Sequence, residues 1–195
     1  MDLKLTGKVA LVTGSTAGIG FAIAQSLAKE GAHVYVNGRT QQRVDAAMAT
    51  IRSHAAGAKV DGIAADFSGS AGAETVIAKL PAVDVLVNNV GIFEPKPFVE
   101  IPDADWFRFF EINVMSGVRL ARHYLSGMLK NNWGRIIFVS SESAVQIPAE
   151  MVHYGMTKTA QVAVARGIAE SVAGTGVTSN SILPGPTDSE GSRLC

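Results

Sequence analysis

The sequence predicts a single open α/β domain in which a parallel sheet is covered by helices on both faces. Short β-branched apolar segments alternate with longer segments of helical periodicity, and no long linker or repeat interrupts them. Most of the short segments are almost entirely apolar, which is typical of strands covered on both faces. Repeated strand–helix alternation indicates right-handed crossovers and therefore a doubly wound sheet.

The expected elements follow one another in regular order. Six segments have the pattern of strands: Lys8–Thr13, His33–Val36, Val60–Ala65, Val83–Asn88, Arg135–Ser140 and Val177–Leu183. Five have apolar residues at helical spacing: Gly18–Glu30, Thr40–Ala56, Ser70–Lys79, Asp103–Asn131 and Glu150–Ala173. A chain of 195 residues fits one domain, which we expect over residues 1–187. Residues 188–195 show neither periodicity, so we expect an irregular tail.

Composition restricts the expected partners. Lys+Arg and Asp+Glu both number 17, so no net charge attracts nucleic acid or an anionic membrane. The four histidines lack metal-ligand spacing, and we expect no metal site. The single cysteine, Cys195, cannot form an intrachain disulfide. Neither a signal peptide nor an apolar run of about 20 residues is present, so we expect a soluble cytoplasmic protein.

A glycine-rich segment, Thr13–Gly20, follows the first expected strand and precedes the first expected helix. In it, Gly14 permits a sharp turn, Gly18 lets the backbone approach a pyrophosphate, and Gly20 lets the helix pack closely. The helix N-terminus would then present unpaired N–H groups and a positive dipole end to phosphates. The spacing is G-x-x-x-G-x-G, and an ordinary glycine-rich turn is the alternative. Its place between strand and helix favours dinucleotide binding.

Tyr154 and Lys158 are four residues apart in an expected helix, so their side chains share one face. Tyrosine has an ordinary pKa of about 10 and is a poor base near neutrality. A nearby ammonium favours the phenolate, so Tyr154 could exchange a proton with an alcohol or alkoxide oxygen. Because this spacing is common by chance, two plain surface residues are the alternative.

These segments together resemble the short-chain dehydrogenases/reductases, whose motifs include a TGxxxGIG loop and a Y-x-x-x-K pair. Ser141, which precedes Tyr154 by 13 residues, matches the family serine that orients the substrate oxygen, and its neighbour Ser140 fits that spacing less well. Asn113 resembles the family member that holds a water linking Lys158 to solvent; a solvent-facing or back-bonded helical asparagine is the alternative. The resemblance implies a Rossmann fold and catalysis by Asn113, Ser141, Tyr154 and Lys158.

The segment after the second strand, Val36–Arg43, indicates which dinucleotide to expect. A carboxylate here would bind the free 2′-hydroxyl of NAD, but the segment contains no acid. Gly38 stands where NAD-preferring members have Asp, and Arg39 follows it. A guanidinium pairs well with phosphate, so NADP(H) is favoured over NAD(H), with Arg39 as main contact and Ser15 as helper. The alternative is that Arg39 and Arg43 are solvated residues.

Further cofactor contacts are implied by the resemblance. Asp66-Phe67 is similar to a family pair beside adenine, although Asp66 could instead cap a helix. The segment at 88–91, with Val90 in place of alanine, is similar to the family's NNAG, and the segment at 184–187 to its Pro-Gly turn under the nicotinamide; Ser189 stands where many members have a threonine. The expected cofactor-binding residues are Gly14, Ser15, Gly18, Ile19, Gly20, Arg39, Asp66, Phe67, Asn88, Gly91, Tyr154, Lys158, Pro184, Gly185 and Thr187.

The resemblance stops after the Pro-Gly turn, where family members continue through a helical lid, another helix and a seventh strand. We therefore expect the sixth strand to be an edge strand with uncovered apolar neighbours, and the substrate pocket to lack its lid. Two hypotheses follow. One is an NADP(H)-dependent carbonyl reductase or alcohol dehydrogenase, and the other is a catalytically silent, truncated module for dinucleotide binding or dimerisation.

The two longest expected helices, Asp103–Asn131 and Glu150–Ala173, resemble the four-helix dimer face of the family. We therefore expect a homodimer or homotetramer. Close approach of the helices would be allowed by small residues, namely Ala160, Ala163, Ala165 and Gly167. The identity of the small-molecule substrate is not encoded in any motif of this sequence.

Overall fold

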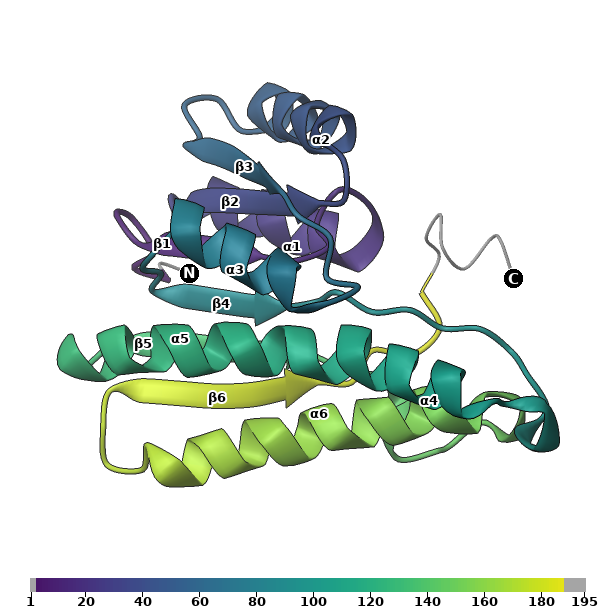
Figure 1. Ribbon diagram of the computed structural model, residues 1–195. Coiled ribbons are helices and arrows are strands. Elements are labelled where there is room, and N and C mark those ends of the chain that lie inside the picture. The colour runs from purple at the N-terminus through teal and green to yellow at the C-terminus, as the bar shows by residue number, and fades with distance from the viewer. Residues whose placement is uncertain (1–2, 188–195) are drawn as a thin grey trace.

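A computed structural model describes residues 3–187, and its centre is a parallel sheet of six strands (Figure 1). The sheet order is β3-β2-β1-β4-β5-β6, with every neighbouring pair parallel. The doubly wound α/β fold is therefore confirmed. The tail expected at residues 188–195, with Ser189, lies outside the described residues. The strands are β1 Val9–Val12, β2 His33–Gly38, β3 Val60–Ala64, β4 Val85–Asn88, β5 Gly134–Val139 and β6 Val177–Ile182.

The helices agree with the sequence pattern except in one region. The segment expected as a single helix over 103–131 contains a π turn, η2 (Glu111–Met115), between α4 and α5. Hydrophobic periodicity does not reveal such a turn, because the helix continues on both sides of it. Three short 3₁₀ turns are η1 (Phe98–Glu100), η3 (Glu142–Ala144) and η4 (Ala149–Met151). The α-helices are α1 Gly18–Lys29, α2 Gln41–His54, α3 Ser70–Lys79, α4 Asp103–Phe110, α5 Ser116–Lys130 and α6 Val152–Ser171.

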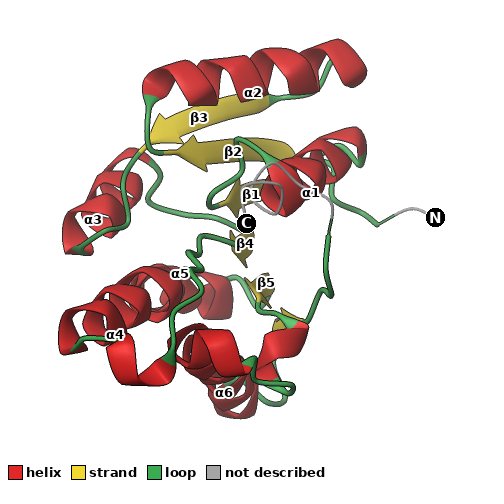
Figure 2. Cartoon of the chain, turned by 90° about the vertical axis from the view of Figure 1, so that its right-hand side faces the viewer, coloured by secondary structure: helices red, strands yellow, loops and turns green. Residues whose placement is uncertain are grey.

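Apolar residues on both faces of the sheet build two cores. Along β1, Leu11 packs into the core beneath α3, α5 and α6, whereas Ala10 and Val12 pack into the core beneath α1 and α2. Figure 2 shows α3 and α5 on one side of the sheet and α1 on the other. Successive strand side chains point to opposite faces, so strands buried on both sides need the nearly continuous apolar pattern that the sequence has.

The strand order reverses between β1 and β4, which is where ligands bind in open α/β sheets. Because the strands are parallel, the loops after β1 and β4 begin at the same edge of the sheet, and the loop after β5 begins at the neighbouring position. At the border of the described sheet, β6 is an edge strand whose Ile182 is 43% exposed. Its edge position agrees with the expectation. Within residues 3–187, none of the helices has the length and hydropathy that crossing a membrane requires.

Candidate active site

The glycine-rich loop forms a cradle at the start of α1. Gly14 and Gly18 have left-handed backbone angles, with φ of +59° and +57°, which favour glycine. A Cβ on Gly20 would lie 2.5 Å from the carbonyl oxygen of Gly14, so the third glycine is also required. The N-cap residue Ala17 offers no side-chain hydrogen bond to the first N–H groups of α1. These N–H groups are therefore left for an anion beside a cleft of about 330 Å³.

Two asparagines that the sequence analysis did not assign to the loop hold it in place. Asn37, at the end of β2, accepts a hydrogen bond from the Gly14 N–H at 3.0 Å, and its amide donates to Ile63 O at 3.0 Å. The Asn89 amide donates to the carbonyl oxygens of Thr13 and Gly14, at 3.0 and 2.9 Å. A polar residue at the end of an apolar strand was the available signal for both.

Ser15 and Arg39 have different environments. The buried Ser15 hydroxyl donates to Val12 O at 2.7 Å and accepts from the Asn37 N–H at 2.9 Å. Ser15 therefore joins β1 to β2, and its hydroxyl is not directed at a phosphate. Arg39 is exposed and forms no hydrogen bond or ion pair within residues 3–187, so its guanidinium can bind a ligand.

Three of the other expected cofactor contacts differ from one another in their surroundings. Asp66 accepts a hydrogen bond from the Ser68 N–H at 2.9 Å in a tight turn; the residue that caps α3 is Gly69, so the alternative of a helix cap is wrong. The Phe67 side chain is buried in the core and does not line the cleft. Asn88 is also buried, and its amide has no hydrogen-bond partner among the described residues.

The cleft brings three of the four expected catalytic residues together. Ser141, Tyr154 and Lys158 line it, as do the remaining expected contacts Ile19, Gly20, Gly91, Pro184, Gly185 and Thr187. The Ser141 hydroxyl accepts from the Ser143 N–H at 3.1 Å and forms a hydrogen bond with Tyr154. The hydroxyl of Ser140 instead donates to the carbonyl oxygen of Lys158 at 2.8 Å, which supports the choice of Ser141.

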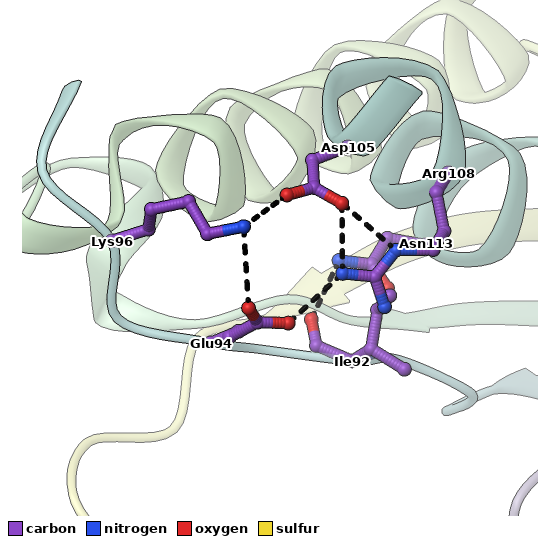
Figure 3. Close-up of polar contacts among 6 residues, drawn as sticks. All are labelled: Ile92, Glu94, Lys96, Asp105, Arg108 and Asn113. Carbon is purple, nitrogen blue, oxygen red and sulfur yellow. Dashed lines mark hydrogen bonds and ion pairs between the residues drawn. The ribbon is translucent and has the colours of Figure 1, made fainter. Parts of the chain in front are cut away.

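Asn113 lies in the π turn η2 and is 1% exposed, so the solvent-facing alternative is wrong. Its carbonyl oxygen Oδ1 accepts from the Ile92 N–H at 2.7 Å, and its amide nitrogen donates to Ile92 O at 3.0 Å (Figure 3). The amide also donates to the Thr157 hydroxyl at 3.0 Å. Asn113 thus fixes the loop after β4 against α6.

A four-residue ion network fastens the same loop to α4. Glu94 and Lys96 from the loop face Asp105 and Arg108 from the helix (Figure 3). Arg108 lies 2.9 Å from Glu94 and 3.2 Å from Asp105, and Lys96 pairs with both acids. The loop so anchored carries Phe93, whose ring contacts that of Tyr154 edge-on at 6.1 Å. The network was not expected, because its loop and helix halves have no common sequence pattern.

Comparison with known proteins agrees with this arrangement. The profile of the short chain dehydrogenase family matches residues 8–193. The chain belongs to this family. It is 49% identical over 191 residues to the uncharacterized oxidoreductase YvaG of Bacillus subtilis, covering 98% of this chain and 72% of the relative. It is 33% identical to the 3-oxoacyl-[acyl-carrier-protein] reductase FabG of Aquifex aeolicus, covering 95% and 76% of the two chains.

Solved structures of this family have the same fold. The L-sorbose reductase from Gluconobacter frateurii, complexed with NADPH and L-sorbose, matches with a TM-score of 0.90 and 34% identity over 97% of this chain and 73% of its own. A 3-oxoacyl (acyl-carrier-protein) reductase from Agrobacterium tumefaciens C58 with NADP bound matches with 0.89 and 30%, over 95% and 72%. The protein is therefore an NAD(P)-dependent oxidoreductase of the short-chain dehydrogenase family.

The electrostatics of the dehydrogenase site are dominated by burial. Burial raises the pKa of Tyr154, and its hydrogen bond with Ser141 opposes that rise. Burial lowers the pKa of Lys158 to about 8. The Lys158 ammonium nitrogen lies 5.5 Å from the centre of the Tyr154 ring, and the side chains of the cleft alone do not make this phenol acidic. The Tyr154 phenol therefore stays protonated near neutral pH in the chain without cofactor.

The buried lysine predicts a pH dependence of stability. Because its pKa is about 8 when folded and near 10.5 when unfolded, the unfolded chain binds more protons between these pH values. The contribution of Lys158 to the free energy of unfolding therefore rises with pH across this window. Between about pH 7 and about pH 9.5, we expect wild type to gain about 2 kcal/mol relative to Lys158→Met.

Urea unfolding of both proteins at the two pH values measures this difference, since other titrating groups are common to both. If the free energies of unfolding of the two proteins changed equally with pH across this window, the lowered pKa of Lys158 would be contradicted.

No three His, Cys, Asp or Glu side chains in the described part of the chain come close enough together to hold a metal ion.

Proposed function

We propose that this protein transfers a hydride between NADP(H) and a carbonyl or alcohol substrate at a Ser-Tyr-Lys site. The observation that carries the proposal is the convergence of Ser141, Tyr154 and Lys158 on the cleft that the start of α1 also lines. A phosphate-binding element and a proton donor thus share one cavity at the carboxyl ends of the strands.

The residues of the cleft fit a dinucleotide. The glycine cradle, with the uncapped start of α1, would hold the diphosphate, and Pro184 and Gly185 would border the nicotinamide. Arg39 would bind the 2′-phosphate of NADP(H), because the end of β2 carries a guanidinium and no acid. The similar L-sorbose reductase is a complex with NADPH. When bound, the cofactor supplies or accepts the hydride.

Each catalytic residue has a separate task. Ser141 would donate a hydrogen bond to the substrate oxygen and stabilise its developing negative charge. Tyr154, held neutral by burial, would give that oxygen its proton during reduction and take it back during oxidation. Lys158 would place positive charge beside the site. Asn113 would act through the loop that it anchors at Ile92.

Consumption of NADPH tests the proposal. The purified chain should bind NADPH and oxidise it when supplied with members of a panel of ketones, aldehydes and 3-oxoacyl thioesters. Tight binding without turnover of any of them would instead support the silent dinucleotide-binding module. Failure to bind either NADPH or NADH would contradict both the oxidoreductase and the silent dinucleotide-binding module.

We also propose that the protein self-associates as a homodimer or homotetramer through α4, α5 and α6. Ala163 and Gly167, one turn apart on α6, are exposed and leave room for a second helix. Ala165 was wrongly assigned to this face, because it is buried in the core of the chain, and Ala160 is half-buried. Phe107 on α4 is 75% exposed, which is unusual for so large an apolar side chain.

Arginine at the open face of α6 should separate the subunits. We expect Gly167→Arg to shift the protein from dimer or tetramer to monomer in sedimentation velocity, because a long charged side chain would replace an empty contact site. Arginine is also a better helix former than glycine, so the fold of the chain should not suffer. Ala49→Arg, at an exposed position on α2, is the matched control and should leave the assembly intact. A monomeric wild type would contradict the assembly.

A further inference from the structure

Gln161 lies beside the catalytic lysine, although no motif singled it out. It is on α6, three residues after Lys158, and it is only 1% exposed. A buried amide is costly unless both of its ends are hydrogen-bonded. The partners of Gln161 therefore indicate what it does in this site.

Both ends of the Gln161 amide are occupied. Its Nε2 donates to the backbone oxygen of Asn113 at 2.5 Å, and its Oε1 accepts from Lys158 Nζ at 3.3 Å. The orientation of the amide follows from chemistry, because an ammonium only donates and a carbonyl only accepts. Gln161 thus connects the lysine to the π turn η2, where the regular helical hydrogen bonding is interrupted.

These contacts account for most of the hydrogen-bonding capacity of the lysine. Of the three N–H donors of Lys158, one goes to Val139 O at 3.0 Å and a second goes to Gln161. One donor is left for a group in the cleft. The other titratable residues that line this cleft are Tyr154 and Glu142, and neither is a hydrogen-bond partner of the ammonium in the described structure.

We propose that Gln161 is a positioning residue, which holds the Lys158 ammonium between β5 and the π turn and fills the place beside the Asn113 carbonyl. The inference rests on the proposed function, in which Lys158 acts next to Tyr154. An amide does not ionise, so it orients the ammonium without taking its proton.

Titration of Lys158 in the cofactor-free chain tests the proposal directly. NMR of the side-chain signals of labelled lysine follows its pKa, with Lys158→Met assigning the signal. Gln161→Leu removes one of two acceptors from a buried ammonium and should lower the pKa of Lys158 by about one unit. Gln161→Glu places a carboxylate there and should raise it. Leucine and glutamate are similar in size, so loosened packing would not be expected to shift the pKa of Lys158 in opposite directions in the two variants.

Thr157→Val is the matched control. It removes the acceptor for the Asn113 amide within the same buried cluster but does not touch the ammonium. We expect this variant to lose stability and to keep the pKa of Lys158 within about 0.3 units of wild type. A shift as large as that of Gln161→Leu would overturn the proposal, because any buried polar loss would then have the same effect.

Kinetics extend the test to the working enzyme. Gln161→Leu should lower kcat about tenfold with a nearly unchanged KM for the carbonyl, and should move the alkaline limb of the kcat profile to lower pH. Gln161→Glu should move that limb to higher pH. If the pKa of Lys158 shifts in opposite directions in the two variants but the chain has no turnover, the role of Gln161 is supported and only the proposed function is contradicted. If the chain is active but the pKa of Lys158 shifts equally or not at all in the two variants, only the role of Gln161 is overturned.

Discussion

Tyr154→Phe should abolish most turnover and leave cofactor binding intact. We expect kcat for carbonyl reduction to fall by about 10²- to 10⁴-fold, because the variant lacks the only proton donor that the proposed mechanism uses. The affinity for NADPH should stay within about twofold, since the lost hydroxyl bonds to Ser141 and not to the phosphate cradle. Phenylalanine retains the edge-on contact with Phe93, so the cleft wall should keep its shape.

Tyr124→Phe is the matched control for the loss of a buried phenol. Tyr124 lies on α5 and does not line the cleft, and its hydroxyl donates to the backbone oxygen of Leu80 at 2.7 Å. This variant should lose about 1 kcal/mol of stability and no activity. If Tyr154→Phe retains wild-type kcat, the assignment of the proton donor is wrong, whatever the control does.

The sequence predicted the backbone of the site better than its side chains. The glycine spacing from Gly14 to Gly20 follows from how the chain must turn. The step from Ser141 to Tyr154 was implied by the family resemblance, and both residues line the same cleft. Ser15 and Phe67 stand at the expected motif positions, but both side chains point into the interior. A motif position fixes the path of the chain, whereas the direction of a side chain depends on which neighbours it can pack against.

The missed residues have a common physical cause. Asn37 and Gln161 are polar residues within apolar strand or helix patterns, where periodicity treats them as interruptions. Their value comes from partners far along the chain, such as Ile63 for Asn37 and Asn113 for Gln161. The π turn was missed for a related reason, because one added residue per turn hardly changes the apolar stripe of a long helix. Contacts of this kind require the tertiary structure.

Arg39→Ala should weaken the binding of NADPH by about tenfold to 100-fold and leave that of NADH unchanged. A hydrogen bond between charged groups contributes about 1.5–3 kcal/mol, and only NADPH carries the phosphate with which Arg39 would pair. The guanidinium is exposed and has no other partner in residues 3–187, so its removal breaks no contact of the folded chain there. Calorimetric titration of both dinucleotides at low and high salt measures the effect, which screening should reduce.

Arg43→Ala separates a specific phosphate contact from general positive charge. Arg43 lies four residues further on, in the first turn of α2. Its substitution by alanine removes the same unit of charge from the same region as Arg39→Ala does. If long-range attraction by positive charge caused the loss of affinity, the two substitutions would weaken the binding of NADPH to the same extent. We expect the larger loss only for Arg39, because the residue directly after β2 lies where an adenosine ribose would sit at the strand ends. Equal losses of affinity for NADPH and NADH in Arg39→Ala would show that Arg39 does not bind the 2′-phosphate.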